Sequence, residues 1–291
     1  MNKFIPKYHF RKGLRHECEV IDLEHFCANN RKIILKPHRT NFNQLFYFHK
    51  AKGIHTVDFE DITLADNSLL FAPKDTVHRF DDKAEVNGVL LLFTDSFFCS
   101  NSQDSILLRN CVLHSNITQS TLIHIPEQNT VFDNIFGQIY REFDNEKDSV
   151  QADILRNYIR LLLLHFIREQ ISLPVFRNQS DNQDFELVRA FEDMLEQHYN
   201  SSPQVAYYCQ SLNVTEKRLQ TATRNILDRS PKEIIKDRIV LEAKRLLVYS
   251  SDSVKEISFR LGFDEPTNFT KFFKKSTGKS PMDFRSSQKN D

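Results

Sequence analysis

The sequence has few cysteines, and none of them is spaced as a pair. Its five cysteines are Cys18, Cys27, Cys99, Cys111 and Cys209. The cysteines are odd in number and contain no CxxC motif, so they do not have the spacing that zinc sites and redox motifs need. We therefore expect free thiols that pack as small apolar residues in a reducing compartment.

Long apolar runs are also missing. The four leucines at residues 161–164 are flanked by Arg160 and His165, and even the five apolar residues 89–93 fall far short of the roughly 20 that a membrane-spanning helix needs. The opening segment MNKFIPKYHFRKG has no apolar stretch of the length that a signal peptide needs. We expect a cytoplasmic protein without membrane contact.

The chain has no net charge, because 39 basic side chains balance 39 acidic ones. The balance is uneven along the sequence. Residues 201–291 hold 17 basic and 11 acidic side chains, a net charge of +6, which leaves 22 and 28, a net charge of −6, for residues 1–200. This split suggests that only the C-terminal part meets a polyanion, although two ordinary solvated surfaces would give the same count.

The length of 291 residues exceeds the roughly 100 to 200 of one domain, so two domains are expected. Between residues 33 and 98, short apolar or alternating runs are separated by turn-like groups. The clearest runs are residues 44–49, 54–59, 68–72 and 88–93. This spacing is typical of an antiparallel β-barrel or sandwich.

After Phe98 the apolar spacing changes to a helical period. Two helices are predicted within residues 130–143 and 153–171. Their apolar faces are Phe132, Ile135, Phe136, Ile139 and Phe143 in the first, and Ile154, Tyr158, Leu161, Leu162, His165 and Phe166 in the second. We expect these faces to pair in a homodimer, although the barrel of the same chain could equally cover them.

Residues 173–184 lose this periodicity and are rich in Asn, Gln, Asp and Ser, with one Pro. That composition predicts a linker. The chain is therefore expected to divide into a domain over residues 1–172, the linker over 173–184, and a helical domain over 185–291.

A helix-turn-helix pattern opens the last third of the chain. Ser202 and Pro203 are predicted as the N-cap and first residue of a two-turn helix. Asn213 suits the left-handed conformation of a tight turn, and Thr215 is predicted to cap the next helix. That helix directs three residues inward: Leu219, Ala222 and Thr223.

The same pattern returns later in the chain. Ser253 and Glu256 are spaced as a capping box, Gly262 stands at the turn, and a helix is predicted from about Glu265. Its apolar stripe consists of Phe269, Phe272 and Phe273. The turn Leu212-Asn213-Val214 aligns with Leu261-Gly262-Phe263, which indicates an internal duplication.

A long helix is predicted between the two units. It begins at Ser230-Pro231, and its apolar side runs through Ile235, Ile239, Ala243, Leu246 and Leu247. Such a rod would fix the distance between two recognition helices. Successive major-groove faces of DNA recur about every 34 Å, so both helices could read one face of double-stranded DNA.

The polar faces of the two recognition helices carry the candidate DNA contacts. Cations neutralise phosphates, and polar groups near a helix N-terminus read base edges. The candidates are Glu216, Lys217, Arg218, Gln220, Thr221 and Arg224 in the first unit, and Glu265, Thr267, Asn268, Thr270, Lys271, Lys274 and Lys275 in the second. Each of them alone is equally well explained as an exposed helix residue.

These motifs together resemble the signature of the AraC/XylS family of transcription regulators. The likeness covers residues 185–285. Its strongest elements are LEAKRLL, Ile257-x-x-x-Leu261-Gly262-Phe263, Phe269-x-x-Phe272-Phe273-Lys274 and Gly278-x-Ser280-Pro281-x-x-Phe284-Arg285. The resemblance implies two recognition helices in consecutive major grooves and recruitment of RNA polymerase. Ala222-Thr223 stands where the family often has Leu-Phe, so the first unit is expected to have a thinner core.

The resemblance also implies a cupin-like sensory barrel followed by a helical dimerisation pair. Residues 42–80, with Gly53, Pro73 and His78, are similar to such a barrel. The fold class expected is α+β with two domains. A pocket for a small-molecule effector is expected at His38, Gln44, Tyr47, His49, His55 and His78. A hydrogen-bonded structural role would explain His78 equally well.

Metal-dependent cupin enzymes bind their metal through a His-x-His cluster, which this sequence lacks. Its barrel histidines are scattered, so no metal and no other cofactor is expected. The function predicted is an effector-responsive or constitutive transcription activator that is not an enzyme. Two alternatives remain: a metal-dependent cupin enzyme with an accessory DNA-binding domain, and a regulator whose barrel only dimerises.

Overall fold

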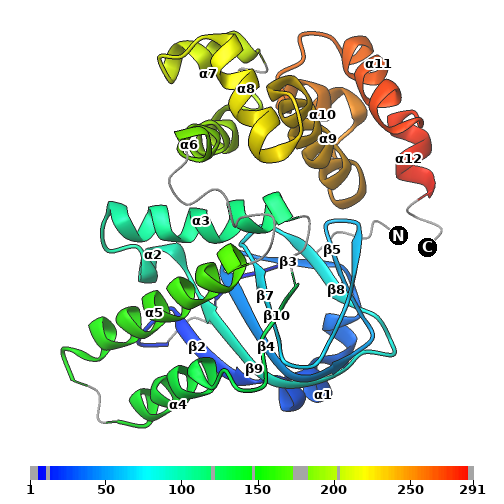
Figure 1. Cartoon of the computed structure of the whole chain (residues 1–291). Helices are drawn as coiled ribbons and strands as arrows, with labels where there is room; N and C mark the ends of the chain where they lie inside the picture. The colour runs from blue at the N-terminus through cyan, green and yellow to red at the C-terminus, as the bar shows by residue number, and fades with distance from the viewer. Residues whose placement is uncertain are drawn as a thin grey trace. The chain divides into compact units, whose positions relative to one another are not determined.

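The computed structural model describes residues 6–10, 14–118, 122–145, 148–172, 183–201 and 204–287. The chain divides into two compact units, Pro6–Ser180 and Asp181–Asp291. All described strands belong to the N-terminal unit, and the C-terminal unit is helical (Figure 1). The predicted α+β fold with two domains is therefore confirmed in outline. None of the described helices is both long and apolar enough to cross a membrane.

The strands of the N-terminal unit form two five-stranded sheets. The first has the order β1-β3-β8-β5-β6 and the second the order β10-β7-β4-β9-β2. The strands are β1 Lys7–Tyr8, β2 Cys18–Asp22, β3 His38–Thr40, β4 Asn43–Lys52, β5 Ile54–Val57, β6 Glu60–Thr63, β7 Ser68–Ala72, β8 Val77–Phe80, β9 Glu85–Phe93 and β10 Leu122–His124.

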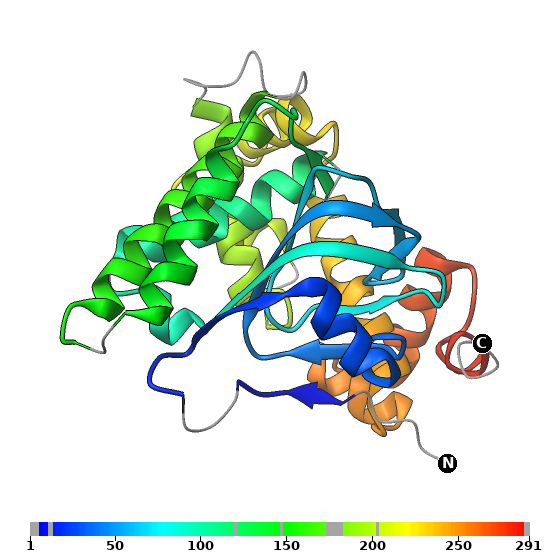
Figure 2. The same cartoon turned by 90° about the horizontal axis from the view of Figure 1, so that it is seen from below.

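The two sides of strand β4 belong to different cores. Phe46 and Phe48 join an apolar cluster with residues of the first sheet and of helix α1. Leu45 and Tyr47 point to the opposite side and join a cluster with the helices that cover the second sheet. Figure 2 shows this helical layer on one side of the sheets. Alternation along a strand thus gives the N-terminal unit two cores.

Five helices accompany the sheets: α1 Leu23–Ile34, α2 Asp95–Phe98, α3 Ser102–Thr118, α4 Val131–Asp144 and α5 Gln151–Ser172. The predicted face of α4 is confirmed, because Phe132, Ile135, Phe136 and Ile139 are buried. The predicted face of α5 is right at Leu162 and Phe166 but wrong at its other positions, since Ile154, Tyr158 and His165 are only partly buried. Its buried stripe is Leu155, Ile159, Leu162, Leu163, Phe166 and Ile167, and Leu161 is exposed.

The shift on α5 has a physical cause in its partner helices. The guanidinium of Arg160 pairs with the buried carboxylate of Asp104 at 2.7 Å, and Arg156 donates to the carbonyl oxygen of Phe97 at 2.9 Å. These bonds orient α5 against α2 and α3. They place the neighbouring Leu161 on the outer face.

The C-terminal unit consists of α6 Gln183–His198, α7 Val205–Ser211, α8 Glu216–Leu227, α9 Pro231–Tyr249, α10 Val254–Arg260, α11 Pro266–Thr277 and α12 Pro281–Ser287. Residues 173–182 of the expected linker lie outside the described residues, and so do Ser202 and Pro203. The N-cap of α7 is Gln204, so the cap predicted at Ser202 is corrected. The last two residues of that linker, Gln183 and Asp184, already belong to α6. Acidic residues are favourable in a first helical turn, where they face the positive end of the helix dipole.

Helix α9 takes part in both apolar cores of the C-terminal unit. Ile235 and Ile239 pack in the first core, with α6, α7 and α8. Ala243 and Leu247 pack in the second core, with α10 and α11. The helix begins with Pro231 after a capping box made by Ser230 and Glu233. The predicted long helix with one apolar side is confirmed.

Candidate functional site

The two helix-turn-helix units have turns with the same hydrogen bonds. The amides of Leu212, Asn213 and Val214 donate to carbonyl groups four, three and five residues earlier, at 2.9, 3.2 and 3.0 Å. The amides of Leu261, Gly262 and Phe263 donate with the same offsets, each at 3.0 Å. The alignment of the turns that the sequence predicts therefore holds for the backbone.

The middle residue of each turn adopts a left-handed conformation. Asn213 has a φ of 53° and Gly262 a φ of 81°. At Gly262 the backbone is also crowded, since a Cβ atom there would lie 2.0 Å from the carbonyl oxygen of Asn200. Asn tolerates this conformation in the first turn, whereas only glycine fits the second.

The helices that follow the turns are similar in length but begin differently. The hydroxyl of Thr215 accepts a hydrogen bond from the amide of Arg218 at 3.1 Å, as an N-cap does. Helix α11 begins with Pro266, and its N-cap Glu265 makes no capping bond through its side chain. The cap predicted at Thr215 is confirmed, and α11 starts one residue later than predicted.

A helix outside the repeated unit takes part in the core of the first unit. Ala222 and Thr223 are completely buried, and the hydroxyl of Thr223 donates to the carbonyl oxygen of Gln220 at 3.2 Å. Phe191 and Leu195 of α6 pack in one apolar cluster with Leu219 of α8. The thinner core expected from the Ala222-Thr223 pair stays a prediction.

The candidate DNA-contacting residues of α8 differ in their exposure and in their partners within the protein. Glu216, Lys217, Thr221 and Arg224 are exposed, whereas Arg218 and Gln220 are half-buried. The guanidinium of Arg218 pairs with the carboxylate of Asp184. Arg224 donates to the carbonyl oxygen of Asp228 at 3.1 Å. Both arginines therefore have partners inside the protein.

Asp184 connects α6 to two residues of α8. Besides Arg218, the side-chain amide of Asn225 donates to its carboxylate at 2.6 Å. The hydrogen bond from Asn225, followed by that from Arg218, lowers the pKa of Asp184 below its usual value. The carboxylate thus remains charged at neutral pH and holds one side of α8 against α6.

The candidates on α11 form a more open polar face. Glu265, Thr267, Asn268, Lys271, Lys274 and Lys275 are exposed, and Thr270 is half-buried. The hydroxyl of Thr270 donates to the carbonyl oxygen of Pro266 at 2.9 Å, and that of Thr267 to the carboxylate of Glu265 at 3.2 Å. No acidic side chain in the described part of the chain forms an ion pair with the three lysines. Their charges are available to a polyanion.

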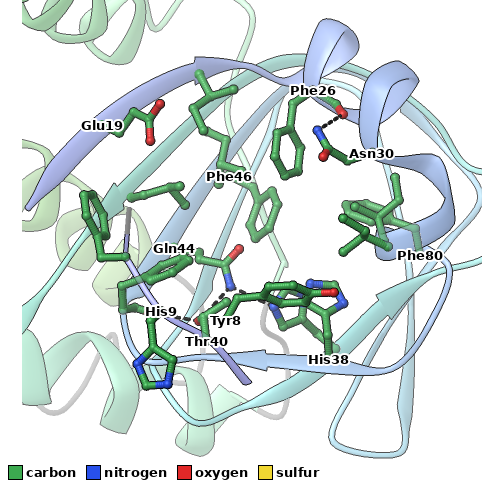
Figure 3. A pocket seen from close by; sticks show the side chains of 18 residues that line it. Tyr8, His9, Glu19, Phe26, Asn30, His38, Thr40, Gln44, Phe46 and Phe80 are labelled. Atoms are coloured by element: carbon green, nitrogen blue, oxygen red, sulfur yellow. Dashed lines mark hydrogen bonds between the residues drawn. The ribbon is translucent and has the colours of Figure 1, made fainter. Parts of the chain in front are cut away.

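A second candidate site is a cavity of about 200 Å³ in the N-terminal unit (Figure 3). Three of the predicted effector residues line it: His38, Gln44 and His78. Most of the wall is apolar and includes Phe26, Phe42, Phe46, Phe80, Leu90 and Leu92. The N-terminal segment and α1 also contribute, through residues such as Tyr8, Phe10 and Asn30. Sequence reasoning missed these residues because it began the barrel at residue 33.

The polar side of the cavity is a chain of hydrogen bonds. The amide nitrogen of Gln44 donates to the hydroxyl of Thr40 at 3.2 Å and to Nε2 of His78 at 2.7 Å. Nδ1 of His78 then donates to Nε2 of His55 at 3.1 Å. His55 is fully buried behind this chain and does not line the cavity. The histidines predicted at scattered positions are thus brought together in part.

Burial keeps these histidines neutral. It lowers the pKa of His55 to about 3 and that of His78 well below its usual value. Burial also lowers the pKa of His38, although a hydrogen bond to the carbonyl oxygen of Lys36 opposes the shift. The described residues contain no group of three or more side chains arranged to hold a metal ion.

The structure places Tyr47 and His49 away from the cavity. The hydroxyl of Tyr47 donates to the carboxylate of Asp133 on α4 at 3.2 Å, and Nε2 of His49 lies 3.3 Å from the same carboxylate. Both residues follow Gln44 at odd offsets along β4, so they point to the helical side of the sheet. The prediction that they line the pocket is therefore corrected.

The C-terminal unit and the chain as a whole are similar to known proteins. Residues 208–287 match the model of a helix-turn-helix domain family. The chain is 22% identical over 254 residues to the HTH-type transcriptional activator RhaS of Klebsiella pneumoniae, an alignment that covers 85% of this chain and 86% of that protein. The activator RhaS of Yersinia pestis is 22% identical over 252 residues, with coverages of 86% and 88%.

The C-terminal region thus contains an AraC-type helix-turn-helix domain. The matched segment contains both turns, since it begins in α7 and ends in α12. The motifs that resemble the AraC/XylS signature lie within the described helices, and the recognition of the family is confirmed.

Two solved structures are also similar to this chain. ToxT from Vibrio cholerae is 13% identical with a TM-score of 0.44, covering 92% of this chain and 97% of that chain. The DNA-binding domain of AdpA, solved in complex with a target DNA, is 24% identical with a TM-score of 0.33. It covers 36% of this chain and 93% of that domain.

Proposed function

We propose that this AraC-family protein binds specific DNA sequences by placing α8 and α11 in adjacent major grooves. The observation that carries the proposal is the repeated unit: the same turn precedes two 12-residue helices, each with an exposed polar face. Packing of α9 into both cores supports a fixed spacing between them. A rigid spacer of this kind suits two contacts on one DNA face.

The two helices are proposed to contribute unequally. On α11, Lys271, Lys274 and Lys275 are exposed and neutralise phosphates, while Thr267 and Asn268 near the helix start reach base edges. On α8, three of the polar candidates are exposed: Lys217, Thr221 and Arg224. Arg218 is held by Asp184, so α8 offers fewer free cations.

Gel-shift titration against genomic fragments tests DNA recognition. A specific site should bind about 10³ to 10⁷ times more tightly than random DNA at physiological salt. Weak and equal binding to every fragment would contradict the proposal. A single genome-wide footprint would then identify the sites and the neighbouring genes.

The output is proposed to be activation through RNA polymerase. The relatives from Klebsiella pneumoniae and Yersinia pestis are named transcriptional activators, which supports this direction. Transcription in vitro from a bound promoter should increase when the protein is added to RNA polymerase. A decrease on every bound promoter would instead make the protein a repressor.

The N-terminal unit is proposed to be a cupin-like barrel that binds an effector and forms a homodimer. The cavity between β-strands and α1 supports effector binding. On α5, Leu161, Leu164 and Ile171 share one face and are 41%, 49% and 41% exposed, which supports a partner on that helix. Residue spacings of three and seven place them on a single stripe.

Light scattering tests the dimer. The wild-type protein should have twice the mass of one chain, and Leu164→Glu should reduce it to one. Lys52→Glu, which changes an exposed residue of β4 outside this stripe, is the matched control and should leave the dimer intact. If the wild-type protein has the mass of one chain, the proposed dimer is wrong, and the proposal of DNA binding is not affected.

A further inference from the structure

The polar side of the cavity offers hydrogen-bond acceptors. Because the amide nitrogen of Gln44 already donates to Thr40 and His78, its carbonyl oxygen remains for another donor. Figure 3 shows this oxygen pointing into the pocket, away from the two bonds. Nδ1 of His38 donates to the carbonyl oxygen of Lys36 at 2.9 Å, so Nε2 of its neutral ring is an acceptor as well.

Among the described residues that line the cavity there is no lysine or arginine. The buried imidazoles of His38 and His78 do not supply positive charge either, since burial lowers the pKa of both. Glu19 is the only carboxylate that the described part of the wall contains. The third histidine of the described wall, His9, is exposed and its ring points away from the cavity (Figure 3). An anionic ligand beside Gln44 would therefore lose its hydration without gaining a cationic partner, and such desolvation is costly.

The remaining wall is apolar and largely aromatic. The rings of Phe10 and Phe42 meet edge to face at 5.4 Å, and Phe46 and Phe80 do so at 6.0 Å. Aromatic rings prefer such edge-to-face or offset neighbours. An apolar cavity of about 150 Å³ is large enough for benzene. A cavity of about 200 Å³ therefore has room for one substituted ring.

We propose that the cavity binds a small uncharged aromatic alcohol of the phenol type, whose hydroxyl group donates a hydrogen bond to the amide oxygen of Gln44. The ring lies against the phenylalanines, and Nε2 of His38 is a second acceptor beside it. This ligand class rests on the proposed role of the N-terminal unit as an effector-binding domain.

Calorimetric titration of the full chain at neutral pH tests the ligand class with phenol, toluene and benzoate. Phenol should bind about tenfold more tightly than toluene, which fills the same space but donates no hydrogen bond. Benzoate should bind at least about a hundredfold more weakly than phenol, because its charge is buried without a partner. Equal or tighter binding of benzoate would overturn the proposal, as would binding of none of the three.

Substitution at Gln44 tests the hydrogen bond. Gln44→Leu keeps the size of the side chain and removes the acceptor, so phenol should lose about tenfold in affinity while toluene keeps its own. Tyr47→Phe is the matched control, because it removes a hydroxyl from the other side of the same strand. Its phenol affinity should equal that of the wild type. Unchanged phenol binding by a folded Gln44→Leu protein would overturn the assignment.

Gel shifts with and without phenol separate the ligand from the wider function. If phenol binds but leaves DNA affinity unchanged, the ligand class stands and the sensory role of the barrel falls. If phenol does not bind while a specific DNA site is still recognised, the ligand class falls and the DNA-binding function stands. The wild-type ranking of the three compounds decides the ligand class even if Gln44→Leu does not fold.

Discussion

Gly262 lies directly against the carbonyl oxygen of Asn200, which a Cβ atom at Gly262 would approach to 2.0 Å. Asn200 follows α6, whereas Gly262 is the turn residue of the second helix-turn-helix unit. The close approach therefore ties the turn between α10 and α11 to the end of α6. It also makes glycine necessary for two reasons, the positive φ and the missing side chain.

Gly262→Ala should destabilise the C-terminal unit and weaken DNA binding. The left-handed conformation alone costs a non-glycine residue about 1 to 2 kcal/mol, and the contact with Asn200 forces the backbone to move in addition. Gly278→Ala is the control, since Gly278 also has a positive φ but no atom within 4 Å of the added Cβ. Urea unfolding should show a clearly larger loss for Gly262→Ala, and equal losses would contradict the steric argument.

Asp184→Asn should release Arg218 toward DNA. The freed guanidinium adds one phosphate contact, so the plot of log affinity against log salt should steepen by about 0.9. Binding to random DNA should tighten at low salt for the same reason. The C-terminal unit should also lose stability, because Arg218 and Asn225 lose a charged partner.

The control for this experiment is Glu186→Gln. Glu186 lies on the same helix and pairs with Arg189, which is not a candidate DNA contact. Its salt slope should equal that of the wild type. If Asp184→Asn and Glu186→Gln behave alike, Arg218 is not restrained by Asp184 in solution.

Substitutions on α11 should distinguish phosphate contacts from base contacts. Lys271→Ala and Lys274→Ala should each weaken binding to every sequence and flatten the salt slope by about 0.9. Asn268→Ala should instead lose about 1 to 3 kcal/mol on the specific site and little on random DNA. Gel shifts at several salt concentrations measure both effects.

Lys52→Ala is the charge-matched control, because Lys52 is exposed on β4 in the N-terminal unit. It changes the net charge by the same amount without touching α11. A slope change of the same size in Lys52→Ala would show that the effect is one of net charge. The assignment of phosphate contacts to α11 would then be wrong.

The stability of the N-terminal unit should fall in acid. Burial lowers the pKa of His55 to about 3 in the folded protein, so the unfolded chain takes up the proton first, near pH 6.5. The stability is fully present above that pH and is lost as the pH falls toward 3. When the unfolded chain binds one proton more than the folded protein, the free energy of unfolding falls by about 1.4 kcal/mol per pH unit.

His55→Gln removes the imidazole that the unfolded chain protonates, and it keeps an acceptor for His78. The free energy of unfolding should therefore fall less steeply between pH 6.5 and 4. His25→Gln replaces an exposed histidine of α1 and should keep the wild-type dependence. Urea unfolding at several pH values measures the slopes. Identical slopes in all three proteins would mean that His55 titrates normally in the folded state.

Several elements follow from local sequence signals, and these are the ones that agree with the structure. The caps at Thr215, Ser230 and Ser253 form between residues three positions apart. The turns at Asn213 and Gly262 depend on the conformational range of one residue. Short-range chemistry of this kind does not need the rest of the fold.

The cavity of the N-terminal unit was predictable only in part. Histidine and glutamine at positions 38, 44 and 78 indicated a polar group in the barrel, and all three line the cavity. Tyr47 and His49 were misplaced, because the sequence does not say which side of β4 faces which core when both sides carry large apolar residues. Tyr8, Phe10 and Asn30 carry no pattern that links them to the barrel.

By itself the sequence determined the caps at Thr215, Ser230 and Ser253, the two turns, and the helix that joins the two helix-turn-helix units, because each depends on residues close together in the chain. Tertiary structure alone decided which face of α5 is buried, since residues 161–164 are all leucine and any of them could point inward. It also decided that Arg218 pairs with Asp184 and that α6 takes part in the first core. These contacts join residues distant in sequence, and only the packed chain brings them together.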